Sequence, residues 1–215
     1  GENLAFSRIQ GVGGLGSYST TNQRMGEGSV VNNIVKAQPI IPVYNIDGYF
    51  ASLKATTLGN FTNPVRQCFY AKDNLNTRYV TVGNVYAAVD IIEGLELKTS
   101  FGINTFSQIY KGFNYPTPEN SEPTMVYSLN ENYDTGLEWT WTNTLNYVKT
   151  FGNNHNINAL VGYEAIDYKR NWMNASMAGY VSTDLAAWYI RDALGDPGTK
   201  NVNSYGEIHS LASLF

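Results

Sequence analysis

The sequence predicts an all-β protein, a segment of an antiparallel transmembrane β-barrel with long loops on one side. The prediction rests most on residues 79–106, where Val85, Ala87 and Val89 alternate with small and polar residues. After a tight turn around Gly94 the same alternation resumes. A period of two on both sides of a turn is typical of a β-hairpin with one apolar face. Each arm has about ten residues or more, which suits a strand that crosses a bilayer at a tilt.

The composition favours strands and polar loops over a helical enzyme. Hydrophobic residues make up 43% of the chain and charged residues only 15%, with 16 tyrosines among 215 residues. A net charge of -4 provides no basic surface for a nucleic acid. The single Cys68 excludes an internal disulfide framework and a cysteine-based zinc site. No apolar run reaches the roughly 18 residues that a transmembrane helix needs.

Six strands are expected, and tight turns alternate with long connections between them. Trp139 and Trp141 open a second hairpin built like the first, with its turn at residues 150–154. The expected strands are residues 3–9, 79–91, 95–106, 138–149, 156–166 and 207–215. The long connections are residues 10–78, 107–137 and 167–206.

The long connections contain short helical signals and many turn residues. One or two helical turns are expected near Val30–Val35, and a short helix at 184–194 that ends before Gly195 and Pro197. Glycine, asparagine and proline in residues 59–64 predict irregular chain there.

The alternation of tight turns and long connections distinguishes two architectures. Outer-membrane barrels have short turns on one side and long loops on the other, whereas β-sandwiches place loops at both ends. The aromatic residues Trp139, Trp141 and Tyr147 share one strand face and are expected to lie at the membrane interfaces. The alternative is a soluble cell-surface β-sandwich that binds carbohydrate, in which these rings fill the core.

Several segments, taken together and in order, resemble one transporter family. They are PIIPVYNIDGYF (39–50), GNFTNPV (59–65), VGNVYAAVDIIEGLELKTSFGIN (82–104), WTWTNTLNYVKTFGNNHNINALVGYEA (139–165) and HSLASLF (209–215). This series is similar to the SusC/RagA family of TonB-dependent outer-membrane transporters. The resemblance implies part of a large 22-stranded barrel, whose lumen is plugged. It also implies uptake of oligosaccharides or peptides across the outer membrane of Bacteroidota-type bacteria.

The same resemblance implies the partners. They are a SusD-like surface lipoprotein, TonB through an N-terminal region absent from this sequence, an oligosaccharide or peptide ligand, and outer-membrane lipid. The sequence contains no plug domain or TonB box and begins and ends within strands, so we expect a fragment of a longer barrel. The long connections would lie outside the cell. Labels at Asn120 or Lys200 should then react from outside, and labels at Gly94 or Asn153 should not.

No catalytic, cofactor or metal site is expected. His155 and His209 have no nucleophile in a recognisable setting, and Glu93 and Glu96 straddle a turn, which disfavours a glycoside hydrolase. The G-x-G-x-x-G motif at residues 11–16 is not followed by a helical pattern or a ribose-binding carboxylate, so it predicts a glycine turn. The aspartates have no metal-loop spacing.

Binding is the chemistry that the sequence favours. A lumen wall is expected from Asn84, Tyr86, Asp90, Glu96, Lys98, Asn158 and Glu164. Exposed loop aromatics that would contact a ligand or a partner are Trp172, Trp188, Tyr189, Tyr115 and Tyr127.

Overall fold

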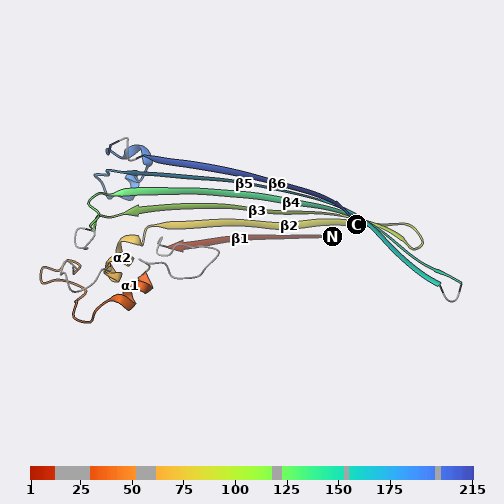
Figure 1. The fold of residues 1–215 in the computed structure, drawn as a ribbon, viewed down its shortest axis with the longest axis horizontal. Coiled ribbons are helices and arrows are strands. Elements are labelled where there is room, and N and C mark those ends of the chain that lie inside the picture. The colour runs from red at the N-terminus through yellow and green to blue at the C-terminus, as the bar shows by residue number, and fades with distance from the viewer. Residues whose placement is uncertain (13–29, 52–61, 118–122, 153–154, 197–199) are drawn as a thin grey trace.

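The structure, a computed structural model, describes residues 1–12, 30–51, 62–117, 123–152, 155–196 and 200–215. One antiparallel six-stranded sheet in chain order dominates it (Figure 1). Its strands are β1 (Glu2–Val12), β2 (Leu75–Ile92), β3 (Leu95–Asn114), β4 (Ser128–Phe151), β5 (His155–Ala178) and β6 (Asn201–Leu214).

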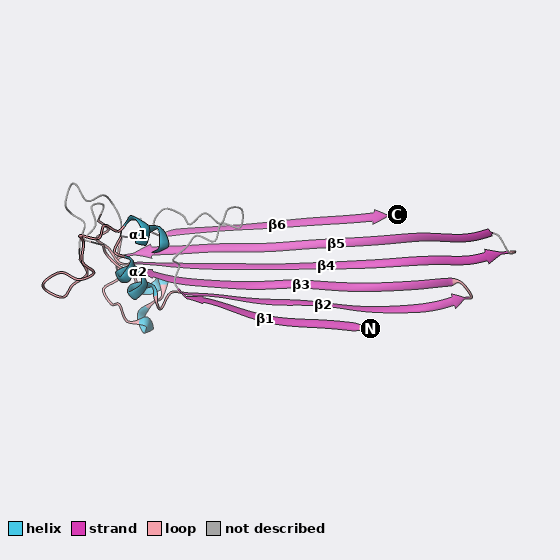
Figure 2. Cartoon of the chain, turned by 90° about the horizontal axis from the view of Figure 1, so that it is seen from below, coloured by secondary structure: helices cyan, strands magenta, loops and turns pink. Residues whose placement is uncertain are grey.

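The sheet is a single curved layer, and the helices and the long loops gather at one of its ends (Figures 1 and 2). The predicted all-β antiparallel class is confirmed. In the described part of the chain the sheet does not close, because β1 pairs only with β2 and β6 only with β5. A β-sandwich would require two packed sheets, and the described residues form one.

The strands extend well beyond the predicted ranges at the end that carries the loops. β4 and β5 contain 24 residues each, and the connections shrink to residues 13–74, 115–127 and 179–200. The additional residues carry polar side chains on both faces, so they show no apolar alternation. They pair through their backbones, and amide side chains also join neighbouring strands, as between Gln108 and Asn76 at 3.0 Å.

Two short helices lie in the first long connection. α1 (Val30–Lys36) coincides with the predicted helical turns, whereas α2 (Pro64–Ala71), which begins at the last residue of the 59–64 segment expected to be irregular, was not predicted. Asn63 caps α2 by accepting hydrogen bonds from the backbone N–H groups of Val65 and Arg66, and Pro64 fits the first helical turn. No helix in the described ranges is long and apolar enough to cross a membrane.

The helix expected at 184–194 is replaced by two single turns of 3₁₀-helix. These turns are η1 (Leu185–Ala187) and η2 (Ile190–Asp192). The Asp184 side chain accepts a hydrogen bond from the Ala186 N–H at 3.0 Å and thereby starts the first turn. The intervening residues Trp188 and Tyr189 turn the chain so that Trp188 packs inward.

Glycine is required in the turn between β2 and β3. Gly94 has a φ of +81°, and a Cβ there would collide with the Val148 carbonyl. The Gly94 carbonyl in turn accepts a hydrogen bond from the Val148 N–H at 2.7 Å, so the turn lies tightly against β4. Gly152, in the next tight turn, has a φ of +61° but no atom within 4 Å of an added Cβ.

Gly94→Ala should therefore impair folding more than Gly152→Ala. The first change combines a strained φ with a backbone collision and should cost about 1–3 kcal/mol, whereas the second carries the smaller strain of φ alone. The folded fraction of the intact protein in membranes, measured by its heat-modifiable mobility in gels, checks this. Equal losses for both variants would contradict the role of the Val148 contact.

Candidate functional site

The register of the strands sorts side chains onto two faces of different chemistry. Val85 pairs with Phe101, which pairs with Trp141, and Trp141 pairs with Ala165, so these four share one face, here called the apolar face. Most of its large side chains are exposed. Further members are Leu97, Ile103, Leu145, Ile157, Val161, Leu4 and Phe6.

On β3 and β4 the apolar face has the height of a bilayer core. At about 3.4 Å per residue and a tilt of about 40°, the stretch of β4 from Leu137 to Tyr147 rises about 26 Å, close to the apolar band of about 25 Å in outer-membrane barrels. Neither β3 nor β4 carries a charged side chain on this face within that band. The one indole N–H in its middle is paired, because Trp141 Nε1 donates to Thr99 Oγ1 at 3.1 Å.

The predicted interface aromatics all lie on the apolar face. Trp139 is the register partner of Asp167, which accepts a hydrogen bond from the Ser210 hydroxyl at 2.6 Å. Tyr147 pairs with Leu95 beside the turn at the opposite end of the strand. Their role at the membrane interfaces stays a prediction.

The opposite face, here called the polar face, carries all seven residues predicted for the lumen wall. Register places Tyr86 beside Ser100 and Asp90 beside Glu96, and the remaining wall residues have the same parity along their strands. The Lys98 ammonium lies 5.2 Å from the centre of the Tyr86 ring. That these side chains line a lumen remains a prediction.

A second polar group on the same face is visible only in the structure. Arg170 donates to both carboxylate oxygens of Asp134, at 2.9 and 2.8 Å, and lies 3.8 Å from Glu207. Next to it, His209 stacks on Tyr168 with ring centres 6.1 Å apart. These residues come from three strands with wide sequence separation, so no local motif announces the cluster.

Two of the predicted loop aromatics are placed differently from the expectation. Trp188 is not exposed: it is 2% accessible and stacks on Phe113 with ring centres 4.7 Å apart. It belongs to a buried cluster with Phe113, Leu129 and Tyr180, and so cannot contact a ligand in this conformation. Trp172 lies in β5 on the polar face rather than in a loop, paired with Asp134 and Tyr205.

The other three loop aromatics remain at the surface but have partners within the protein. Tyr115 and Tyr127 are half-buried against the cluster. Tyr189 is exposed, with the Lys111 ammonium 4.5 Å and the Arg191 guanidinium 5.6 Å from its ring centre. A ligand role for these tyrosines stays a prediction.

Burial raises the pKa of two phenols in this region, those of Tyr180 and Tyr115. It is the main cause that raises the pKa of Tyr180 to about 12, with the carboxylates of Glu131 and Asp192 adding to it. The Tyr180 hydroxyl also donates to the Tyr189 carbonyl at 3.0 Å, a bond that ionisation would remove. Burial likewise raises the pKa of Tyr115, so both phenols, which are already protonated at physiological pH, stay protonated to a higher pH than an exposed tyrosine.

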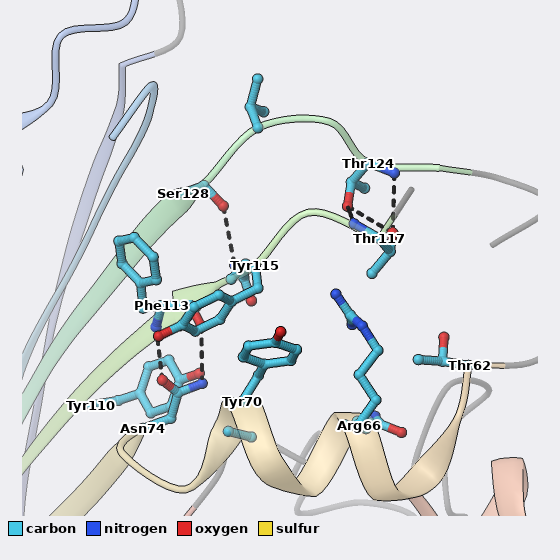
Figure 3. Close-up of a pocket in the computed structure, with 14 residues that line it drawn as sticks. Thr62, Arg66, Tyr70, Asn74, Tyr110, Phe113, Tyr115, Thr117, Thr124 and Ser128 are labelled. Atoms are coloured by element: carbon cyan, nitrogen blue, oxygen red, sulfur yellow. Dashed lines mark hydrogen bonds between the residues drawn. The ribbon is translucent and has the colours of Figure 1, made fainter. Parts of the chain in front are cut away.

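A cavity of about 510 Å³ lies between α2 and the outer ends of β3 and β4 (Figure 3). Asn74 fixes its floor, because its side-chain oxygen accepts from the Phe113 N–H at 2.8 Å and its amide donates to the Phe113 carbonyl at 3.4 Å. Tyr70 of α2 stacks on Tyr115 with ring centres 4.3 Å apart. The buried Arg66 donates to the Pro116 carbonyl and lies over the Tyr70 ring.

The far wall of the cavity is closed by a pair of threonines. The Thr117 and Thr124 hydroxyls are 2.9 Å apart, and the Thr117 N–H donates to the Thr124 carbonyl at 2.8 Å. Beside them, Asn114 donates to the Ser128 hydroxyl at 3.2 Å. The sequence analysis did not predict this cavity, although Asn63-Pro64 is a helix-start signal that would have placed α2.

The residues considered for catalysis and metal binding do not come together. Among the described residues, no group of three or more His, Cys, Asp or Glu side chains is arranged to hold a metal ion. His155 begins β5 beside a tight turn, whereas His209 pairs with Tyr168 in the middle of the sheet, so the two histidines lie far apart. Most of the 11–16 glycine motif, and the label positions Asn120 and Asn153, lie outside the described residues.

Comparisons with known proteins agree on one class. No family model matches the chain. Two curated relatives from Formosa agariphila are "TonB-dependent receptor P3", 27% identical over 203 residues, and "TonB-dependent receptor P39", 26% identical over 194 residues. They match 88% and 89% of this chain, and the chain spans only 18% of the length of each.

Solved structures with the same fold are those of the RagAB peptide importer. In its 'closed-closed' state the match covers 99% of this chain and 23% of that chain, with a TM-score of 0.73 and 18% identity. In the 'open-open' state the TM-score is also 0.73, at 19% identity. The relatives are therefore named as receptors and importers rather than as enzymes.

Proposed function

We propose that this chain, which is a segment of the β-barrel of a SusC/RagA-type TonB-dependent receptor of the outer membrane, forms part of the wall and the outer loops of a nutrient importer. The observation that carries the proposal is the single-layer sheet with one apolar and one polar face. A layer with both faces uncovered suits a wall between hydrocarbon and a water-filled lumen. Since the chain spans 18% of its curated relatives, the activity is proposed for the whole receptor.

In this proposal the polar face borders the path of the nutrient. The predicted wall residues near the turns and the Arg170–Asp134 cluster nearer the loops would face the lumen. Arg170 offsets part of the charge of Asp134 and Glu207, but Asp90 faces Glu96, and the named residues of this face include more carboxylates than cations. Such a wall offers hydrogen bonds and an excess of negative charge, and it contributes no bond-breaking chemistry.

The proposed partners follow from the receptor class. A SusD-like surface lipoprotein would meet the outer loops, TonB would act through another part of the receptor, and the ligand would be an oligosaccharide or a peptide. Of these ligands, a peptide is the cargo for which the RagAB importer of similar fold is named.

The uptake proposal is tested directly by growth. A strain that lacks the receptor should lose growth on one oligosaccharide or peptide supplied as the only carbon source, and the intact gene should restore it. A strain with the TonB gene deleted should show the same loss. Unchanged growth on every such nutrient that the parent strain uses would contradict the proposal.

A matched pair of lysine substitutions tests the assignment of the two faces. Ala87 lies on the apolar face near mid-height, and Ser100 lies on the polar face one row away on the neighbouring strand. Ala87→Lys should destabilise the inserted barrel by about 2–4 kcal/mol, and Ser100→Lys should be tolerated. The amount of folded receptor in outer membranes measures both, and the reverse order would exchange the faces.

Surface labelling tests the orientation. Cys68 is exposed in α2, so a membrane-impermeant maleimide should label the natural protein in whole cells. In a Cys68→Ser background, Lys200→Cys should react from outside and Glu93→Cys only after the outer membrane is permeabilised. Reaction of Glu93→Cys alone in whole cells would invert the orientation.

A further inference from the structure

We propose that the cavity between α2 and the outer ends of β3 and β4 binds a neutral sugar of one or two rings. The site lies in the loop region, apart from the wall residues near the turns (Figures 2 and 3). The proposed sugar site goes beyond the importer proposal, because a sugar can bind in this cavity whether or not a nutrient passes through the barrel.

The chemistry of the residues that line the cavity suits a polyol. Of the fourteen described residues that line the cavity, seven carry a hydroxyl and three carry a side-chain amide. Four contribute aromatic rings: Tyr70, Tyr110, Phe113 and Tyr115. Sugars present apolar C–H faces that pack on rings and hydroxyls that both donate and accept, so a mixed aromatic and polar lining matches them.

Three phenols have unused hydrogen-bonding capacity. In the described chain, the hydroxyls of Tyr70, Tyr110 and Tyr115 form no hydrogen bond with another residue, although all three side chains line the cavity. The Tyr70 hydroxyl points into the space beside Arg66 (Figure 3). Partly buried hydroxyls without a protein partner are favourable positions for hydrogen bonds to a ligand.

The charges favour a neutral ligand over a peptide. No carboxylate is among the described residues that line the cavity, so the ammonium group of a peptide or a lysine would find no counter-ion there. Among the same described residues the one cation is Arg66, which donates to the Pro116 carbonyl and lies over the Tyr70 ring. An extended peptide also has no strand edge to pair with, because β3 and β4 each have partners on both sides.

The size limits the ligand to a short piece of a polymer. A volume of about 510 Å³ falls inside the range of about 300–1,000 Å³ that is typical of small-molecule pockets. α2 is anchored to the sheet by Asn74 and by the Tyr70–Tyr115 stack, so the cavity is formed before any ligand binds.

Saturation-transfer NMR on the intact receptor in detergent tests the site. The probes are glucose, galactose, mannose, N-acetylglucosamine and their β-linked disaccharides, with an acetylated and amidated tripeptide as the alternative ligand. At least one sugar should show transfer to its ring protons. Tyr70→Phe combined with Tyr115→Phe should weaken its binding about tenfold, because the rings remain and two hydrogen bonds are lost.

Two variants separate the cavity from the rest of the receptor. Ser128→Trp should fill the cavity and abolish the signal, whereas Ser100→Trp, on the polar face near mid-height, should leave it unchanged. Tyr205→Phe is the matched hydroxyl control outside the cavity. Heat-modifiable gel mobility confirms that each variant is folded.

Several outcomes would overturn the proposal. They are no transfer to any sugar, binding that persists in folded Ser128→Trp, and transfer to the tripeptide that Ser128→Trp removes. Failure of the importer proposal would appear in the growth experiment instead, since sugar binding by the purified receptor does not depend on uptake.

Discussion

The structure depends on the backbone ladder that joins each strand of the described sheet to its neighbours. In hydrocarbon no water satisfies an N–H or C=O group, so each must bond within the protein. β4 and β5 accordingly pair without a register shift from Ser128–Ala178 to Phe151–His155, and β3 pairs with β4 along its whole length. A shift occurs only between Asp90 and Ile92, next to a turn. Unbroken register fixes the parity of every side chain, and parity creates the two faces.

A single layer has no interior, so the polar face is organised by contacts between strands. Glycines on this face make room for flat rings: Phe106 lies across Gly136 and Phe215 across Gly162, where an added Cβ would collide with each ring. The Arg78 guanidinium then covers Phe106 from the other side, 4.6 Å from its centre. These rings cover the surface that glycine leaves without a side chain, and they do not project far from the sheet.

The sequence predicted those stretches of the strands in which one face is apolar and the other is polar. Alternation around Val85 and Trp141 located the central strands, and parity alone placed all seven proposed wall residues on one face. The outer halves of the strands were missed because residues such as Asp134 and Thr135 are polar on both faces. Loop packing was also missed: Trp188 meets Phe113 across a wide sequence separation, and no local pattern encodes that contact.

The loops contain the protein's own small core, and this has a consequence for specificity. In the described chain, the fully buried large side chains Phe113, Leu129 and Trp188 all lie at the end of the sheet that carries the loops. The loops are thus stabilised by burial of apolar area, whereas the wall depends on the backbone ladder and on its surroundings. Because the two regions are held by different forces, the lining of the cavity can vary without disturbing the strand register. A binding site placed on this core is therefore better suited to select a ligand than the wall. In the wall, each side chain must suit the chemistry of the apolar or the polar face on which it lies.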